Sequence, residues 1–120
     1  MQQLKSQEEL EILLGVQPLV DGAAALPETA CIYFTASWCG ACKALDLDAI
    51  TAATKEVAPG LKWLICDIDQ NNYSAGYCGV RSIPGFIVIH KKKLVHTIKS
   101  NKTEKVVASL VTKLEDLKQQ

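Results

Sequence analysis

Hydrophobic residues gather in short continuous runs that alternate along the chain with segments of helical spacing. Three runs rich in β-branched and aromatic residues, at residues 31–34, 61–66 and 86–89, predict strands that are buried on both faces. Residues 94–98 follow a lysine-rich turn and predict an edge strand that forms a hairpin with the third run. Residues 2–5 predict one further short strand.

Four helices are expected between and after these strands. A capping box at Ser6–Glu9 predicts a helix over residues 7–14, and residues 16–29 form a connector. A second helix is expected to open at Cys39 and to stop at Pro59–Gly60. The last two are expected over residues 71–77 and 102–118. Because strands alternate with helices, the pattern predicts an α/β fold with a parallel core and an antiparallel edge at the terminal hairpin.

Length and charge narrow the class of protein. The 120 residues suffice for one domain, in which residues 1–29 supply a helix and connector and residues 30–118 the core. Thirteen basic residues balance thirteen acidic ones, so no net charge favours nucleic acid or an acidic membrane as partner. The N-terminus lacks the pattern of a secretory signal, and no apolar run approaches the roughly 20 residues that cross a bilayer. We expect a soluble, cytoplasmic protein.

Two cysteines stand where the first buried strand is expected to pass into a helix. The motif around them is Trp38, Cys39, Gly40, Ala41, Cys42 and Lys43. Unpaired N–H groups and the positive end of a helix dipole favour thiolate over thiol at such a position, and Lys43 adds positive potential. We therefore expect Cys39 to attack a substrate disulfide and Cys42, one helical turn deeper, to resolve the mixed disulfide.

Other interpretations of the cysteine pair are weaker. A structural zinc site needs a second ligand pair, but Cys66 and Cys78 lie in different predicted elements, and His90 and His96 are expected to face water. A chance pair in the core does not account for the tryptophan and the strand–helix junction. A permanent structural disulfide is disfavoured by the strained four-residue loop and by reducing surroundings.

The remaining three cysteines, Cys31, Cys66 and Cys78, lie in or beside apolar stretches and are expected to be small buried hydrophobes. Such use of cysteine indicates a reducing compartment. Cys78 has a second interpretation, as a regulatory thiol open to glutathionylation or intermolecular bridging, but a passive helix cysteine is favoured.

A proline directly before the third buried strand, Pro84, marks a special backbone turn because it cannot donate to a strand ladder. On residue statistics alone the Ile83–Pro84 bond is expected to be trans, the usual state of such bonds.

The Trp-Cys-Gly-x-Cys-Lys motif, the segment Asp67-Ile68-Asp69-Gln70-Asn71 and the segment Gly79-Val80-Arg81-Ser82-Ile83-Pro84 together resemble the thioredoxin family over about residues 30–118. The resemblance implies a thioredoxin fold, a central mixed sheet of four to five strands flanked by helices. It also implies that the Ile83–Pro84 bond is cis and lies beside the two sulfurs, where Pro84 keeps metals off.

The same resemblance assigns substrate contacts and partners. Trp38, Ile83 and Pro84, together with Gly40 and Ala41, would form an apolar groove in which the backbone of Ile83 pairs with an extended substrate. The implied activity is that of a monomeric protein-disulfide reductase in electron transport. No metal or other cofactor need bind, and the expected partners are disulfide-containing proteins and a separate NADPH-dependent flavin enzyme of the thioredoxin-reductase kind.

The chain departs from the family pattern near the cysteines. Ala41 replaces the usual proline between them, which predicts a less reducing potential than the ~−270 mV of thioredoxin. Tyr33 and Ile65 stand where family members carry a buried aspartate and a lysine. A phenol is a poor base at neutral pH, so slower resolution by Cys42 is expected. Leu47 replaces a proline that often kinks the following helix, which predicts a straighter helix.

Two other functions remain open at this point. One is a disulfide oxidant or isomerase of higher potential, which Ala41 and Tyr33 favour and the missing secretory signal disfavours. The other is a non-enzymatic module that uses the fold to hold a partner protein. Fold alone does not decide between these functions and a reductase.

Overall fold

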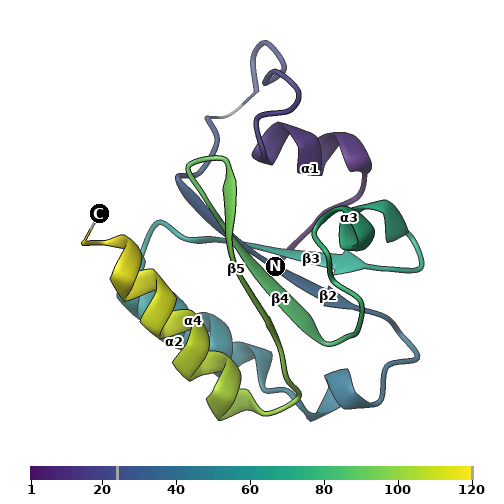
Figure 1. Cartoon of the computed structure of the whole chain (residues 1–120), viewed down its shortest axis with the longest axis vertical. Coiled ribbons are helices and arrows are strands. Elements are labelled where there is room, and N and C mark those ends of the chain that lie inside the picture. The colour runs from purple at the N-terminus through teal and green to yellow at the C-terminus, as the bar shows by residue number, and fades with distance from the viewer. Residues whose placement is uncertain (24, 120) are drawn as a thin grey trace.

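A five-stranded mixed sheet with helices on both faces organises the chain (Figure 1). This is a computed structural model, and it describes residues 1–23 and 25–119. The elements in chain order are β1 (Gln2–Gln3), α1 (Gln7–Leu13), β2 (Thr29–Thr35), the 3-10 helix η1 (Ala41–Ala44), α2 (Leu47–Val57), β3 (Lys62–Asp67), α3 (Asn72–Tyr77), β4 (Gly85–His90), β5 (Lys93–Lys99) and α4 (Thr103–Leu117). The fold class expected from the sequence is confirmed.

The order of the strands across the sheet is β1-β3-β2-β4-β5. β1, β3 and β2 run parallel, whereas β4 is antiparallel to both β2 and β5. The expectation of a parallel core with only an antiparallel edge is therefore wrong. The connection from β3 to β4, with the six-residue α3 in it, returns to the end of the sheet that it left, a choice that the alternation of strands and helices does not reveal. The chain enters β4 at the end of the sheet where it left β3.

The strands are covered on both faces because alternate side chains point to opposite sides of the sheet. In β2, Cys31 and Tyr33 belong to one hydrophobic cluster, and Ile32 and Phe34 belong to the other. Helices α2 and α4 cover the first cluster, and α1 and α3 cover the second (Figure 1). The continuous hydrophobic runs of the sequence are thus explained by burial of both sheet faces.

The region after the cysteine pair differs from the straighter helix expected there. Only the short η1 follows Cys39; Leu45 is extended (φ −83°, ψ 141°), and α2 begins at Leu47. The side chain of Asp46 caps α2 by accepting a hydrogen bond from the Ala49 N–H at 3.0 Å, and the Asp46 N–H donates to Thr103 Oγ1 at 3.0 Å. The cap and the bond to α4 break the helix, so the expectation drawn from Leu47 is wrong.

A buried hydrogen bond fixes α2 against the sheet. The indole Nε1 of Trp63 on β3 donates to Thr54 Oγ1 of α2 at 3.0 Å, and the Thr54 hydroxyl donates in turn to the Ile50 carbonyl at 2.8 Å. Both polar groups of this buried pair are satisfied, which removes the free-energy cost of leaving them unpaired in the core. This explains why Thr54, a polar residue, lies on the hydrophobic face of α2.

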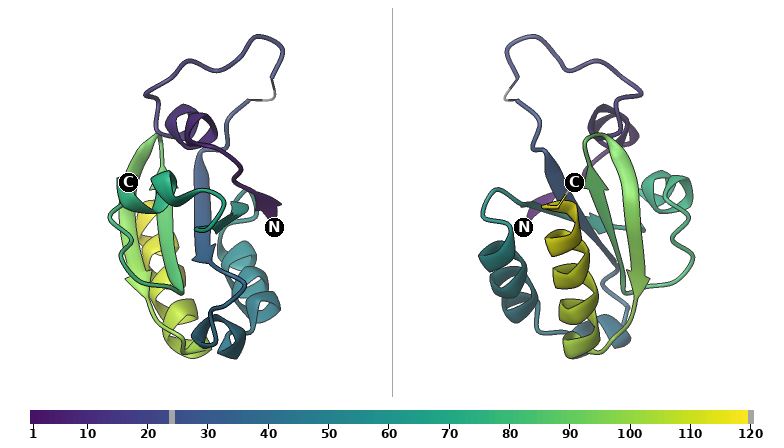
Figure 2. Two further views of the ribbon diagram at one scale, coloured as in Figure 1. Left: turned by 90° about the vertical axis from the view of Figure 1, so that its right-hand side faces the viewer. Right: turned by 60° about the vertical axis from the view of Figure 1, so that its left-hand side comes forward.

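The described parts of the connector between α1 and β2, residues 16–23 and 25–28, lie at the end of the sheet opposite the Cys39–Cys42 turn, where they protrude beyond the strands (Figure 2). The buried carboxylate of Glu11 on α1 accepts hydrogen bonds from the Gln17 side chain at 2.9 Å and from the Tyr73 hydroxyl of α3 at 3.1 Å. These bonds hold the start of the connector to both helices of that face.

The two histidines do not face water as expected. His90 ends β4 and is buried, with Nδ1 2.8 Å from Thr29 Oγ1. His96 on β5 is half-buried, with Nε2 2.7 Å from Ser109 Oγ of α4. In both cases a tertiary hydrogen-bond partner, which a local sequence pattern does not reveal, allows the ring to be covered.

Among the helices of the described residues, none is both long enough and apolar enough to traverse a bilayer.

The cap at Asp46 generates a stability prediction. Asp46→Ala removes the acceptor for the first turn of α2 and is expected to lower the free energy of unfolding by about 0.5–2 kcal/mol, measured by urea denaturation. Asp46→Asn keeps a capping oxygen and should retain most of the stability, while Asp116→Ala on the exposed face of α4 is a matched control. Equal stability of Asp46→Ala and the native chain would show that the cap does not hold α2.

Candidate active site

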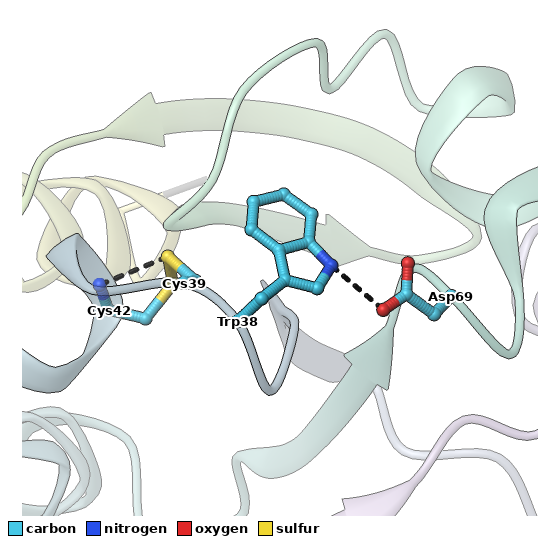
Figure 3. Close-up of a disulfide and its surroundings, with 4 residues drawn as sticks. All are labelled: Trp38, Cys39, Cys42 and Asp69. Atoms are coloured by element: carbon cyan, nitrogen blue, oxygen red, sulfur yellow. Dashed lines mark hydrogen bonds between the residues drawn. A yellow bond between two sulfur atoms is a disulfide. The ribbon is translucent and has the colours of Figure 1, made fainter.

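The Cys39–Cys42 pair lies just beyond the carboxyl end of β2 and forms a disulfide across the start of η1. The Cys39 N–H donates to the Ala36 carbonyl at 3.1 Å, and the Cys42 N–H donates to Cys39 Sγ at 3.1 Å (Figure 3). The two cysteines are 5% and 7% exposed, so burial alone does not distinguish their roles. The two sulfurs differ in one respect: the Cys42 N–H is directed at Cys39 Sγ, and a backbone donor so placed would favour a thiolate at that sulfur after reduction.

The expectation that Cys39 opens an α-helix is only partly met. Gly40 has αR dihedrals (φ −64°, ψ −40°), and Ala41 begins η1, which ends at Ala44. The helix N-terminus beside Cys39 is therefore that of η1, a single short turn. The longer helix α2 begins only at Leu47, after the extended residue Leu45. Gly40, Ala41 and Lys43 are exposed.

Trp38 is 64% exposed, and its indole ring is directed away from the disulfide (Figure 3). Its Nε1 donates to Asp69 Oδ2 at 2.8 Å, and the Asp69 N–H donates to Asp67 Oδ1 at 2.9 Å. No role for Asp69 was predicted from the sequence. A usable signal was present, because Asp69 follows a strand parallel to β2, and the carboxyl ends of parallel strands meet at one edge of the sheet.

Ile83 and Pro84 enter β4 beside this turn. Their peptide bond is cis, as the family resemblance implied, and the trans bond expected from residue statistics is wrong. Pro84 is buried and Ile83 is half-buried. Among the described residues, neither the N–H nor the C=O of Ile83 takes part in a hydrogen bond. Both backbone groups of Ile83 are therefore unpaired within the part of the chain that the structure describes.

A hollow of about 310 Å³ brings together Trp38 and Ile83, with Ile68, Ala75 and the segment Val80–Ser82 forming the rest of its wall. Of the substrate-contact residues expected from the sequence, only these two line the hollow. Gly40, Ala41 and Pro84 lie outside it.

The sheet behind the disulfide is hydrophobic. Tyr33 is 2% exposed and stacks on Phe86, with ring centroids 5.0 Å apart and an interplanar angle of 19°. Cys39, Cys42 and Tyr33 belong to one cluster, with Ile65 packed against it. The buried acidic side chain of the described residues, Glu11, lies on the opposite face of the sheet. Among residues 1–23 and 25–119, no buried carboxylate therefore lies on the sheet face that packs against Cys39 and Cys42.

The other cysteines are buried free thiols, as expected. Burial raises the pKa of Cys31 to about 12. Burial, and then the charge of Asp67, raises the pKa of Cys66 to about 11. Burial, and then proximity to Cys66, raises the pKa of Cys78 to about 12. Within the described residues, no group of three or more His, Cys, Asp or Glu side chains is placed to hold a metal ion.

Comparison with known proteins gives concordant matches. The family model described as Thioredoxin matches residues 24–113. Thioredoxin from Bacillus subtilis is 34% identical over 80 residues, which cover 67% of this chain and 76% of that protein. A thioredoxin-like protein from Synechocystis is 36% identical over 66 residues, 55% of this chain and 60% of that protein.

Solved structures share the fold. The crystal structure of Fasciola hepatica thioredoxin superposes with a TM-score of 0.71 at 24% identity and covers 93% of this chain and 98% of its own. Malassezia sympodialis thioredoxin superposes with a TM-score of 0.73 at 19% identity, over 95% of this chain and 92% of its own.

The raised thiol pKa values generate a labelling prediction. With pKa values of about 11 and 12, roughly one in ten thousand or fewer of the Cys31, Cys66 and Cys78 thiols is ionised at pH 7. After reduction, brief iodoacetamide treatment at pH 7 should modify Cys39 first and leave these three intact, as read by peptide mass. Labelling in guanidinium, which should reach all five cysteines, is the control. Comparable native labelling of Cys78 and Cys39 would contradict this picture.

Proposed function

Because this chain belongs to the thioredoxin family and is a thiol–disulfide oxidoreductase, we propose that it acts as a protein-disulfide reductase. Cys39 is the attacking cysteine and Cys42 the resolving one. The observation that supports these roles is the hydrogen bond from the Cys42 N–H to Cys39 Sγ in the disulfide, because the same contact, kept after reduction, would stabilise a thiolate on Cys39.

The reaction consists of two exchanges. The Cys39 thiolate attacks one sulfur of the substrate disulfide, the substrate S–S bond breaks, and the departing sulfur takes up a proton. The Cys42 thiol then loses its proton and attacks Cys39 Sγ, which releases the second substrate thiol and forms the Cys39–Cys42 disulfide. The substrate gains two electrons and two protons, and the enzyme dithiol loses the same number.

Substrate binding is proposed to use Ile83 and the groove beside it. The open N–H and C=O of Ile83 can pair with the backbone of an extended substrate in the manner of an added strand. Trp38 and Ile83 supply apolar surface in the adjoining hollow, and Pro84 directly follows Ile83 in the chain. Gly40 and Ala41, which are exposed between the two cysteines, are proposed to contact the substrate as well. Lys43 is proposed to contribute positive potential beside the sulfurs.

Tyr33 is proposed to set the pace of resolution. Its ring occupies the core position where family members have a carboxylate, and it stacks on Phe86. A phenol does not accept a proton readily at neutral pH, so the Cys42 proton must leave to solvent or substrate. Because Tyr33 stands where a carboxylate would be, the hydrophobic cluster around Cys39 and Cys42 contains no buried negative charge among its residues. Repulsion from such a charge therefore does not oppose formation of the Cys39 thiolate.

Renewed reduction of the disulfide is assigned to a separate NADPH-dependent flavin enzyme, so no cofactor need be held by this chain. We further propose an electron-transport role in the cytoplasm as a monomer. Three buried free thiols support a reducing compartment. The family match does not favour a disulfide oxidant, an isomerase or a non-enzymatic binding module.

Trapping of the intermediate tests the assignment of roles. Cys42→Ser should accumulate a stable mixed disulfide between Cys39 and a peptide that contains one intramolecular disulfide, because the resolving thiol is missing. Cys39→Ser should form no comparable adduct, and Cys78→Ser should turn over like the native chain. The adduct is located by peptide mass spectrometry. An adduct on Cys42 in Cys39→Ser, with none in Cys42→Ser, would reverse the proposed roles.

A further inference from the structure

A second hollow, of about 280 Å³, lies on the β5 side of the segment that leads into Ile83 and Pro84. Its wall includes Arg81 and Ser82 from that segment and Thr97 and Lys99 from β5. It shares Val80, Arg81 and Ser82 with the hollow that contains Trp38 and Ile83. The two hollows therefore adjoin along one segment, immediately before the open backbone groups of Ile83.

The two cations of this second hollow are unpaired. Arg81 and Lys99 are both exposed, and among the described residues neither forms an ion pair with an acidic side chain. Asp69 lies on the other side, where it is bonded to Trp38, a residue that lines the first hollow and not the second. Arg81 and Lys99 therefore add to the positive charge of Lys43 beside Cys42, and they add it on the β5 side.

The backbone fixes these cations relative to Pro84. Gly85 lies opposite Lys99 in the β4–β5 ladder. A Cβ at Gly85 would lie 2.9 Å from Val80 Cγ1 and 3.1 Å from the Ser82 carbonyl oxygen. The absence of a side chain at Gly85 lets Val80 and Ser82, the neighbours of Arg81, pack closely on β4, and the same residue is the ladder partner of Lys99.

We propose that Arg81 and Lys99 select disulfide substrates that carry an acidic residue close to the reactive cysteine. This inference rests on the proposed reductase function. A substrate strand paired with Ile83 advances about 3.3 Å per residue and turns alternate side chains to the same face. The second hollow shares the segment that leads into Ile83, so we place the selected aspartate or glutamate about two to four positions from the attacked cysteine, about 7–13 Å along an extended strand.

The expected preference is moderate, because exposed ion pairs are weak and are screened by salt. Each cation should favour an acidic substrate by roughly two- to five-fold, and the two together by roughly five- to twenty-fold. Attraction between opposite charges acts mainly on the rate of encounter, so the preference should appear in kcat/KM at low ionic strength.

The experiment compares two disulfide peptides of equal length, one with glutamates and one with lysines at the positions flanking the cysteines. The native chain should reduce the glutamate peptide at least about five times faster in kcat/KM. Arg81→Glu/Lys99→Glu should reverse this order. Lys55→Glu/Lys118→Glu has the same net charge, with both changes on exposed positions of α2 and beyond α4, and should keep the native preference.

Each outcome decides one of the two proposals. Equal kcat/KM for both peptides with the native chain, or an unchanged preference in Arg81→Glu/Lys99→Glu, would overturn the role of these cations and leave the reductase function standing. Reduction of neither peptide would instead refute the reductase function. If the double variant does not fold, the salt dependence of the native chain decides: the preference must fall towards one at 0.5 M NaCl, and a preference independent of salt contradicts the inference.

Discussion

The antiparallel pairing of β2 with β4 is the constraint on which the site depends. Phe34, near the carboxyl end of β2, lies opposite Gly85, the first residue of β4. The chain therefore leaves β2 towards Cys39 at the same end of the sheet at which Pro84 enters β4. One register brings the reactive disulfide and the open backbone of Ile83 to a common edge, although more than forty residues separate them in the sequence. A slip of one residue would turn every side chain of β4 to the wrong face and separate the two parts of the site.

The inner and outer sides of the disulfide differ in chemical character. On the inner side, Tyr33 and Phe86 present a stacked hydrophobic surface without a buried carboxylate. On the outer side, the apolar hollow at Trp38 adjoins a second hollow flanked by Arg81 and Lys99. The buried thiols lie in the sheet and beside α3, where burial keeps them protonated and unreactive. Of the five cysteines, only Cys39 and Cys42 are therefore expected to take part in thiol–disulfide exchange.

Much of the fold could be predicted from local sequence, because its causes are local. Continuous hydrophobic runs marked the strands, and the capping oxygens of Ser6 and Asn71 begin α1 and α3 where expected. The failures have tertiary causes. The direction of β4 depends on its pairing with β2, the break before α2 depends on the bond between Asp46 and Thr103, and the burial of His90 depends on Thr29. The cysteine pair was evident from its motif, whereas Asp69 and Lys99 join the site only through neighbouring strands.

The most direct test is a redox titration of the native chain in glutathione buffers, with acid trapping of thiols and mass analysis of each cysteine. We expect a single reversible two-electron transition in which only Cys39 and Cys42 change state. Its midpoint should be less negative than the ~−270 mV of thioredoxin, towards ~−200 to −230 mV, because Ala41 replaces proline between the cysteines. A pair that stays oxidised throughout, or a transition shared with Cys31, Cys66 or Cys78, would contradict the account.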